Sequence, residues 1–258
     1  MSENELLFSL FFVSCRSKNK VEQPMIKDFD LLQRANNDYT TIDLEHAEEL
    51  AYRELIDSIR YIPLGDECGV MGNIANIITY KGRFYIQEEQ FDRVFIYDDT
   101  GRCLKKIDNK GRGPGEYLRI ESIDINTEKE ELMLVDGMSD KLFFYDLDGN
   151  FKSIHSIRYF QTENTLCLRD SVFLHISAPS QNFGNEGLYG YALVLSKGNE
   201  NFLKGYRYLP LQVGYKGGGQ IFKGYERSCY HPIYSDTIYQ ILSDTTYGPI
   251  FYFRFLSV

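Results

Sequence analysis

Asp92-Arg93-Val94-Phe95-Ile96-Tyr97-Asp98 returns 48 residues later as Asp140-Lys141-Leu142-Phe143-Phe144-Tyr145-Asp146. Each copy is an apolar and aromatic run that begins and ends on an aspartate, and a glycine, Gly101 or Gly149, follows at the same distance. Runs of β-branched and aromatic residues between turn residues are typical of β-strands. The spacing therefore predicts one structural unit that is repeated along the chain.

Each copy lies inside a set of four short segments with strand character. In the first unit the predicted strands are residues 74–80, 83–87, 93–97 and 102–107. In the second unit they are residues 120–125, 132–135, 141–145 and 151–157. Two later stretches fit the same grid as third strands of further units: Tyr191-Ala192-Leu193-Val194-Leu195 and Asp236-Thr237-Ile238-Tyr239-Gln240-Ile241.

A period of about 40 to 50 residues with four short strands per unit is typical of β-propeller blades. Coincidental spacing among ordinary hairpins is the alternative, and four matches to one grid argue against it. We therefore predict an all-β fold, namely a β-propeller of four-stranded antiparallel blades, with about four blades in this chain.

The two best-defined units are separated by Lys110-Gly111-Arg112-Gly113-Pro114-Gly115-Glu116-Tyr117. Three glycines and a proline within five residues cannot continue a helix or a strand. The stretch lacks the Gly-Lys-Ser/Thr ending of a phosphate-binding loop and does not lead from a strand into a helix. We expect a structural crossover loop built on Gly111, Gly113, Pro114 and Gly115, in which Arg112 or Glu116 ties neighbouring blades together.

These features resemble the six-bladed β-propeller lipoproteins of Gram-negative anaerobes, which are relatives of NHL-repeat propellers. Four stretches carry the resemblance: Ile42-Asp43-Leu44, Asp57-Ser58-Ile59-Arg60-Tyr61-Ile62-Pro63-Leu64, the loop from Gly111 to Tyr117, and Ser235-Asp236-Thr237-Ile238-Tyr239. The resemblance implies six blades, so residues 251–258 would end the chain in the middle of a blade. We therefore expect an incomplete propeller, truncated at its C-terminus, over residues 39–258.

The N-terminus resembles a bacterial lipoprotein signal. Leu6-Leu7-Phe8-Ser9-Leu10-Phe11-Phe12-Val13 is an apolar run too short to span a bilayer as a helix, and Cys15 follows it directly. The resemblance implies a signal peptide at residues 1–15, lipid attachment at Cys15 and a tether at residues 16–38. Because no acidic cluster follows Cys15, we expect an outer-membrane lipoprotein that faces the periplasm. A buried apolar terminus with a structural cysteine is the alternative.

Two local elements and four cysteines complete the structural expectations. The sequence predicts a short helix within residues 43–59 and an edge strand at Tyr61-Ile62-Pro63-Leu64. The cysteines form no C-x-x-C pair, which argues against a zinc or redox motif. Two disulfides and buried free thiols both remain open for these residues: Cys68, Cys103, Cys167 and Cys229.

The charge of the chain bears on its partners. There are 28 Lys and Arg against 37 Asp and Glu, which gives a net charge of −9. A negative field does not attract nucleic acid or an anionic membrane surface. We therefore expect no nucleic-acid partner, and contact with the membrane only through a lipid anchor.

The irregular segments converge on one face of the predicted propeller. In a blade, the loop that leads to the next blade lies on the same face as the turn between the second and third strands. Loops on a rigid scaffold commonly carry function. The candidate ligand-binding residues on this face are Arg112, Glu116, Tyr117, Asn182, Asn185, Tyr189, Tyr215 and Lys216. Three aspartates mark the same turn in different blades, and we expect them to cap turns rather than bind a metal: Asp92, Asp140 and Asp236.

The sequence shows no catalytic motif. The four histidines, His46, His155, His175 and His231, are isolated, and there is no nucleophile elbow. The favoured function is therefore a non-enzymatic binding or scaffolding module for a protein, peptide or glycan, without a cofactor or metal. The alternative is an envelope hydrolase or lyase of the propeller type, acting on glycans or lactones with a metal in its channel. A degraded, inactive paralogue is the third reading.

Overall fold

The computed structural model describes residues 30–31, 33–34, 38–44, 56–157, 161–169, 171–177, 182, 188–198, 201–208, 219–223, 228–232, 235–242 and 246–254. Within these residues every regular element is a β-strand, which confirms the all-β prediction. No helix long and apolar enough to cross a membrane occurs among them. Of the segment predicted to be helical, Asp43 belongs to a strand, residues 56–59 are not helical, and residues 45–55 lie outside the described part.

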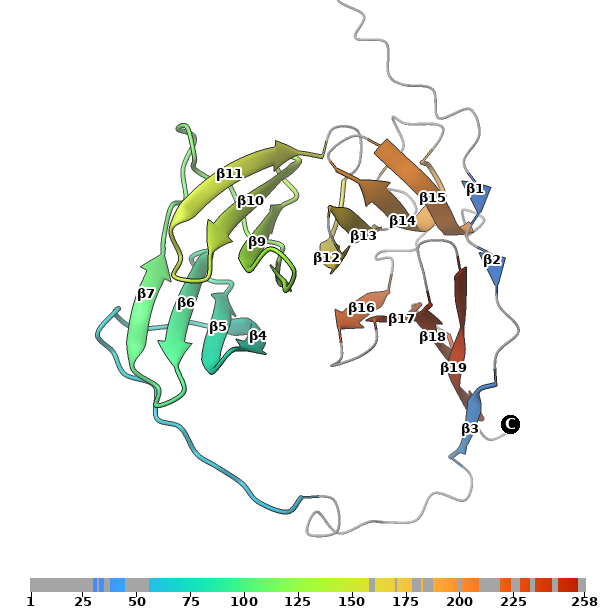
Figure 1. Ribbon diagram of the computed structural model, residues 1–258, viewed down its shortest axis with the longest axis horizontal. Coiled ribbons are helices and arrows are strands. Elements are labelled where there is room, and N and C mark those ends of the chain that lie inside the picture. Colours follow the sequence, from blue (N-terminus) through green and yellow to red (C-terminus); the bar gives the residue numbers. More distant parts are fainter. Residues whose placement is uncertain are drawn as a thin grey trace, which may run out of the picture.

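Four antiparallel sheets follow one another around a common centre and form a four-bladed β-propeller (Figure 1). Blade 1 consists of β4 (Ile74–Tyr80), β5 (Arg83–Glu88), β6 (Arg93–Asp98) and β7 (Cys103–Ile107). Blade 2 consists of β8 (Ser122–Asn126), β9 (Glu131–Asp136), β10 (Lys141–Asp146) and β11 (Phe151–Ser156). Blade 3 consists of β12 (Asn164–Arg169), β13 (Val172–Ile176), β14 (Tyr191–Lys197) and β15 (Asn201–Tyr208). Blade 4 consists of β16 (Gln220–Lys223), β17 (Ser228–His231), β18 (Thr237–Ile241) and β19 (Thr246–Arg254). The four repeated third strands are therefore β6, β10, β14 and β18, as the spacing predicted.

Asp98 and Asp146 explain the recurring turn after the third strand. The Oδ1 atom of Asp98 accepts hydrogen bonds from the N–H and hydroxyl of Thr100, and these bonds lower the pKa of the Asp98 carboxyl to about 2. Asp146 accepts the equivalent N–H groups in blade 2. The turn then passes through Gly101 or Gly149 with φ of 88° or 79°, a conformation that favours glycine. The repeated Asp-x-x-Gly pattern therefore forms the turn between the third and fourth strands of these two blades.

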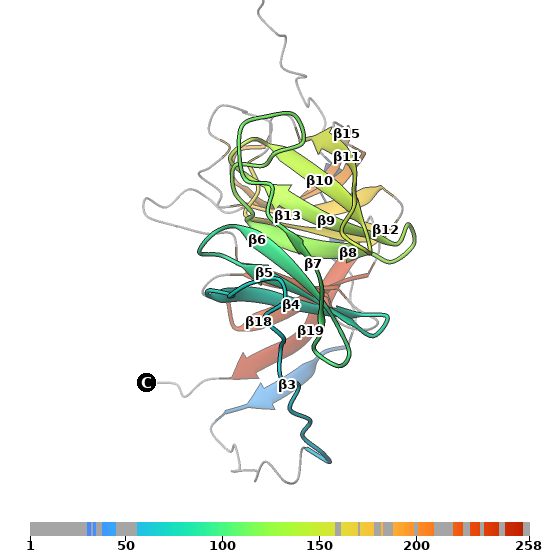
Figure 2. The ribbon, with the colours of Figure 1, turned by 90° about the vertical axis from the view of Figure 1, so that its left-hand side faces the viewer.

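The N-terminal strands cover the outer edges of blades 3 and 4. β1 (Asp30–Leu31) pairs in parallel with β15, and both β2 (Gln33–Arg34) and β3 (Thr40–Asp43) pair in parallel with β19. Figure 2 shows β3 beside β19. Because β1 and β2 fall within residues 16–38, the sheets begin inside the segment that the sequence assigned to a tether. Covering an edge strand removes a template for unwanted pairing.

Two sequence predictions about local structure are wrong. Residues 251–254 do not lie in the middle of a blade, because they belong to β19, the fourth strand of blade 4; residues 255–258 lie outside the described part. Residues 61–64 form no strand, although an edge strand was predicted there. They run past the blade 1 hairpin instead, and the N–H of Gly65 donates to the carbonyl of Gly101 at 2.8 Å.

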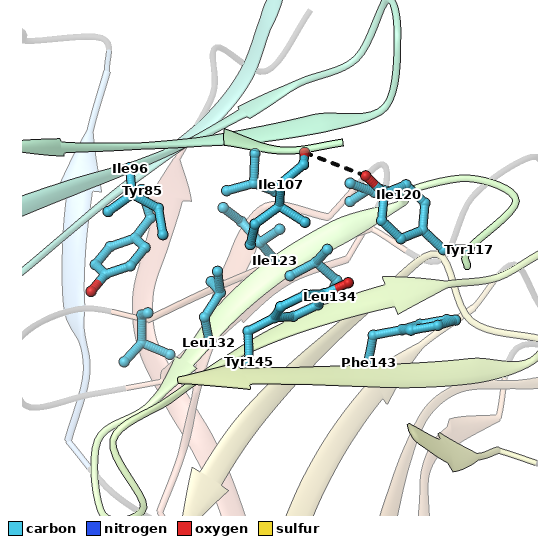
Figure 3. Packing of buried hydrophobic residues seen from close by; sticks show 12 residues of the cluster. Tyr85, Ile96, Ile107, Tyr117, Ile120, Ile123, Leu132, Leu134, Phe143 and Tyr145 are labelled. Atoms are coloured by element: carbon cyan, nitrogen blue, oxygen red, sulfur yellow. Dashed lines mark hydrogen bonds between the residues drawn. The ribbon is translucent and has the colours of Figure 1, made fainter. Parts of the chain in front are cut away.

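The core lies between the faces of neighbouring blades. Between blades 1 and 2, Tyr85 and Ile96 meet Leu132 and Tyr145 in one buried cluster (Figure 3). Further clusters join blade 2 to blade 3 and blade 3 to blade 4. The apolar runs of the sequence are buried on both faces for this reason, which also explains why they do not alternate with polar residues.

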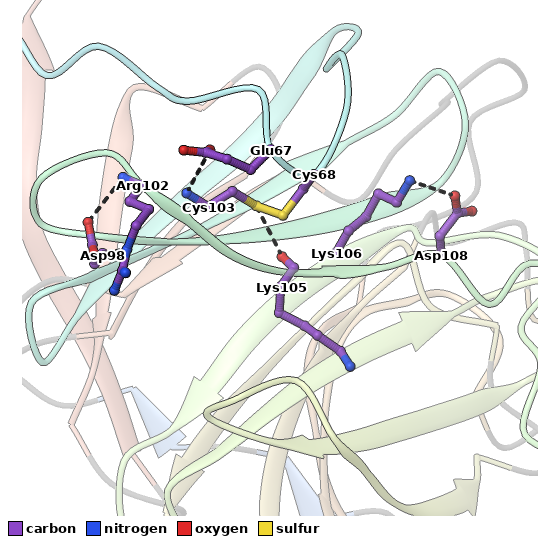
Figure 4. Close-up of a disulfide and its surroundings, with 8 residues drawn as sticks. All are labelled: Glu67, Cys68, Asp98, Arg102, Cys103, Lys105, Lys106 and Asp108. Atoms are coloured by element: carbon purple, nitrogen blue, oxygen red, sulfur yellow. Dashed lines mark hydrogen bonds and ion pairs between the residues drawn. A yellow bond between two sulfur atoms is a disulfide. The ribbon is translucent and has the colours of Figure 1, made fainter.

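In the described part of the chain, one face of blade 1 packs against the preceding segment and not against another blade. Ile86, Phe95 and Tyr97 on this face are covered by the preceding segment through Cys68 and Met71. A disulfide between Cys68 and Cys103 attaches that segment to β7 (Figure 4). Of the two possibilities left open by the sequence, one bridge therefore forms, and the remaining cysteines, Cys167 and Cys229, are buried thiols outside any disulfide.

Candidate binding cavity and loop face

The first strands of all four blades line a cavity of about 860 Å³ at the centre of the propeller. Cavities of this size are typical of ligand sites in proteins. The lining residues come from β4 and the turn after it, from β8 and its turn, and from β12 and β16. From the sequence we expected the site on the loop face instead. The cavity could not be expected, because no local pattern connects four strands that are so far apart in the chain.

Apolar side chains and amides of this cavity are available to a ligand. Ile77 and Phe222 line it and remain 50% and 44% exposed. The amide side chains of Asn76 and Asn164 also line it. The cavity therefore offers apolar surface with a few polar groups, which is the usual character of a binding site.

Lys223 fixes three blades to one another at one side of the cavity. From blade 4 its Nζ donates to the carbonyl of Ile125 in blade 2 at 3.0 Å and to that of Cys167 in blade 3 at 2.8 Å. It also lies 3.4 Å from the buried carboxylate of Asp124, which accepts the N–H of Cys167 at 2.7 Å. Burial raises the pKa of Asp124 and the charge of Lys223 opposes that rise. These charges therefore serve the structure.

A second charged pair joins the turns that follow β4 and β8. Lys81, in the turn after β4, forms an ion pair with Glu130 in the turn after β8. Both side chains are more than half exposed, so the pair contributes little to stability. The hydroxyl of Tyr80 donates to the carbonyl of Thr127 at 3.4 Å beside it.

The glycine-rich loop lies between two turns that carry aspartates. Asp92, in the turn between β5 and β6, forms an ion pair with Lys110 and accepts the N–H of Ile120 at 3.0 Å. Asp136, at the end of β9, accepts the N–H of Leu118 at 2.7 Å. The structure thus brings the inter-blade loop and the turns between second and third strands to one face. Lys110 and the N–H of Ile120 attach the loop to the turn at Asp92 in blade 1, and the N–H of Leu118 attaches it to Asp136 in blade 2.

Tyr117 of the expected ligand face is a core residue. Its side chain is fully buried, its hydroxyl donates to the carbonyl of Asp92 at 2.8 Å, and the same oxygen accepts the N–H of Asn109 at 3.1 Å. Burial raises the pKa of this hydroxyl well above its usual value. Figure 3 shows the ring among the apolar side chains between blades 1 and 2, 5.9 Å from that of Phe143. This side chain is out of reach of a ligand.

Glu116 stabilises the loop from within. Its Oε2 accepts the N–H of Gly113 at 2.6 Å, and a Cβ on Gly111 would lie 2.0 Å from the same oxygen. A side chain at position 111 would therefore displace this carboxylate, whereas Gly115 is required by its φ of 82°. Arg112 is exposed and contacts no other described residue through a hydrogen bond or ion pair. Neither side chain links neighbouring blades, so that part of the expectation is corrected.

The other candidate residues of the loop face differ in their structural environments. Asn182 is buried, and it accepts the N–H of Gln161 at 2.8 Å and donates to Ser177 at 2.9 Å, which ties the loop before blade 3 to the insertion within it. Tyr189 is partly exposed beside the start of β14. The remaining candidates lie outside the described residues, as does the lipid-attachment residue: Asn185, Tyr215, Lys216 and Cys15.

The three aspartates at equivalent turns have three different environments. Asp92 is bonded to the next loop, as described above. The Oδ1 of Asp140 is buried and has no hydrogen-bond partner among the described residues, and burial, aided by Asp136, raises the pKa of its carboxyl. Asp236 is exposed and accepts the hydroxyl of Thr237 at 2.9 Å. Within the described ranges, no three His, Cys, Asp or Glu side chains gather as they would around a metal ion.

His175 and Ser196 have the spacing of a general base and a nucleophile, at 2.8 Å. Both are fully buried, however, and the other ring nitrogen contacts the hydroxyl of Thr165 at 2.9 Å rather than a carboxylate. Burial lowers the pKa of His175 to about 3, which keeps the ring neutral. His231 bonds to the carbonyl of Ser235, and His46 lies outside the described residues. Without substrate access, the arrangement at His175 is structural.

Fold and cavity together define this chain as a four-bladed β-propeller with a central cavity. Residues 39–257 match the family model described as "Domain of unknown function (DUF4934)". The chain belongs to the DUF4934 family. No protein of established annotation matches it in sequence.

Solved structures support the fold. The crystal structure of a "Putative exported protein" from Bacteroides fragilis NCTC 9343 matches with a TM-score of 0.68 and 19% sequence identity, over 77% of this chain and 56% of that one. This chain thus spans little more than half the length of that protein. A DUF4221 family member from Bacteroides vulgatus ATCC 8482, with a TM-score of 0.44 and 10% identity over 73% of this chain and 60% of that one, is too distant to carry an argument. At these identities the likeness concerns the fold alone.

Proposed function

We propose that this chain is an exported β-propeller of the cell envelope that binds a protein, peptide or glycan in its central cavity and acts as a binding or scaffolding module. The observation that carries the proposal is the cavity itself. Its wall combines exposed apolar side chains, Ile77 and Phe222, with the amide side chains of Asn76 and Asn164. The charged groups around it, Lys223 and Asp124, are already engaged in joining blades.

Two observations support the export of this chain. Cys68 and Cys103 form a disulfide, and structural disulfides persist in oxidising compartments such as the periplasm. The similar structure from Bacteroides fragilis carries the name of a "Putative exported protein".

We add to the proposal the lipid anchor at Cys15, the outer-membrane location facing the periplasm, and a propeller of six blades in the complete form. Labelling with a radioactive fatty acid tests the anchor, because Cys15→Ala abolishes the label if the anchor is real.

The binding site is tested with a pair of matched variants on peptide and glycan arrays. Thr79→Arg places a long charged side chain at the cavity wall, whereas Leu104→Arg makes the same change on the outer strand of blade 1. We expect the array ligands of the native chain to be lost with Thr79→Arg and retained with Leu104→Arg. Ligands that survive Thr79→Arg but are lost with Arg112→Ala or Tyr189→Ala would move the site to the loop face and overturn the cavity.

A further inference from the structure

Residues 56–64 form an exposed stretch that leads to blade 1 (Figure 1). Their backbone N–H and C=O groups make no hydrogen bond to any other described residue until Gly65 donates to Gly101. Ile59 and Tyr61 are 66% and 88% exposed. Among the described residues, large apolar side chains are otherwise mostly buried between blades, so this stretch outside the strands is unusual in exposing apolar side chains next to unpaired backbone groups.

We infer that this stretch pairs in antiparallel fashion with the same stretch of a second copy of this chain. Unpaired backbone groups on an extended segment are a ready template for strand pairing. A two-fold axis brings one surface patch against itself, so the sequence must be complementary to its own reverse. Residues 56–61 meet this requirement in one register, in which the axis passes between Ser58 and Ile59.

In that register every cross-strand pair is favourable or neutral. Ile56 lies opposite Tyr61 of the partner subunit, which is an apolar–aromatic pair, and Ser58 lies opposite Ile59 of the partner subunit. Asp57 lies opposite Arg60 of the partner subunit, so two ion pairs form, one on each side of the axis. Such cross-strand pairs are the units that stabilise β-sheets. Shifting the axis by one residue, onto Ile59, removes both ion pairs.

Arg60 holds the stretch in place for this pairing. Its guanidinium donates to the carbonyl of Asp99 at 2.7 Å, in the hairpin of blade 1. A guanidinium has five N–H donors, so the contact leaves others for a carboxylate. The backbone bends at Asp57, and pairing with the second copy would straighten it. The charge complementarity within the stretch itself favours a second copy over an unrelated partner.

Charge reversal tests this inference. Sedimentation equilibrium of the full native chain, between low and high micromolar concentration, should show a monomer–dimer equilibrium. Asp57→Arg places two arginines opposite each other, and Arg60→Asp does the same with two aspartates. Each variant should weaken dimerisation by about tenfold or more, because two favourable pairs become two unfavourable ones. Lys105→Asp, an equal charge change on the exposed side of β7, should leave the dimer unchanged.

Mixing the two variants gives the decisive measurement. The Asp57→Arg variant then has arginine at both positions 57 and 60, and the Arg60→Asp variant has aspartate at both. Each arginine faces an aspartate in the mixed pair, so a one-to-one mixture should form a heterodimer although each variant alone does not. The lost contact between Arg60 and Asp99 cannot produce this recovery. A native chain that stays monomeric at all concentrations, single variants that dimerise like the native chain, or a mixture without heterodimer would each overturn the inference.

Discussion

The Oδ1 atom of Asp92 accepts the backbone N–H of Ile120 at 3.0 Å, although the two residues are 28 positions apart and Ile120 lies just ahead of blade 2. The other oxygen of the same carboxylate pairs with Lys110. One side chain thus sets the position at which the chain leaves blade 1 and enters blade 2.

Asp92→Ala should therefore lower the free energy of unfolding by about 2 to 3 kcal/mol, because the buried N–H of Ile120 loses its partner. Asp92 also has a φ of 56°, which asparagine tolerates better than alanine. Asp92→Asn keeps a hydrogen-bond acceptor and tolerates the same φ, so its free energy of unfolding should fall clearly less than that of Asp92→Ala. Urea unfolding of both variants measures the difference. Equal losses would show that the carboxylate acts only through its charge.

Lys223→Met should be more damaging, at about 3 to 5 kcal/mol, because it leaves the buried carboxylate of Asp124 without a counter-charge. The added change Asp124→Asn removes that charge and should restore part of the loss. Urea unfolding at neutral pH gives both values. If the double variant is no more stable than Lys223→Met alone, the hydrogen bonds from Lys223 to the two carbonyls, and not its charge, hold the blades.

Asp98 should make stability depend on pH in the acid range. Its folded-state pKa is lowered from 3.8 to about 2, so its contribution is fully present above pH 3.8 and is lost as the pH falls towards 2. Asp98→Ala should flatten the decline in unfolding temperature between these pH values relative to the native chain. Lys105→Ala serves as a control on the neighbouring strand. An unchanged slope in Asp98→Ala would assign the acid sensitivity to other carboxylates.

Reducing the disulfide between Cys68 and Cys103 should destabilise blade 1 selectively. The bridge closes a loop with a sequence separation of 35, for which a stabilisation of about 3 kcal/mol is typical. Hydrogen exchange should rise first at Ile86 and Phe95, which the attached segment covers. The variant Cys68→Ser with Cys103→Ser should show the same exchange without reductant. A uniform rise over all blades would contradict a local role.

The sequence predicted the blades well because a blade is a local unit. The hairpin that contains Asp98 and Gly101 depends on residues within one turn, and its copy at Asp146 and Gly149 makes the pattern visible. The role of the aspartate as the cap of this turn, and of the glycine as its residue with positive φ, could have been predicted from the repeated Asp-x-x-Gly pattern.

The contacts between blades could not be predicted in the same way. Lys223 reaches Asp124 across 99 residues, and no local pattern connects them. Tyr117 was assigned to a surface because it follows a glycine-rich loop, yet its ring enters the core as soon as that loop ends. Pairing of Cys68 with Cys103 depends on how residues 61–73 cross blade 1, where the predicted edge strand does not form.

The pairing of β3 with β19 has a kinetic consequence. Thr40 lies beside Phe251, so strands near one end of the chain bind a strand near the other. Each blade can fold from contacts that are close in sequence, but this last parallel pairing has a very long loop to close. During synthesis β2 and β3 therefore wait, unpaired, until the final sheet has been made, and this interval is when the chain is most exposed to proteolysis and misassembly.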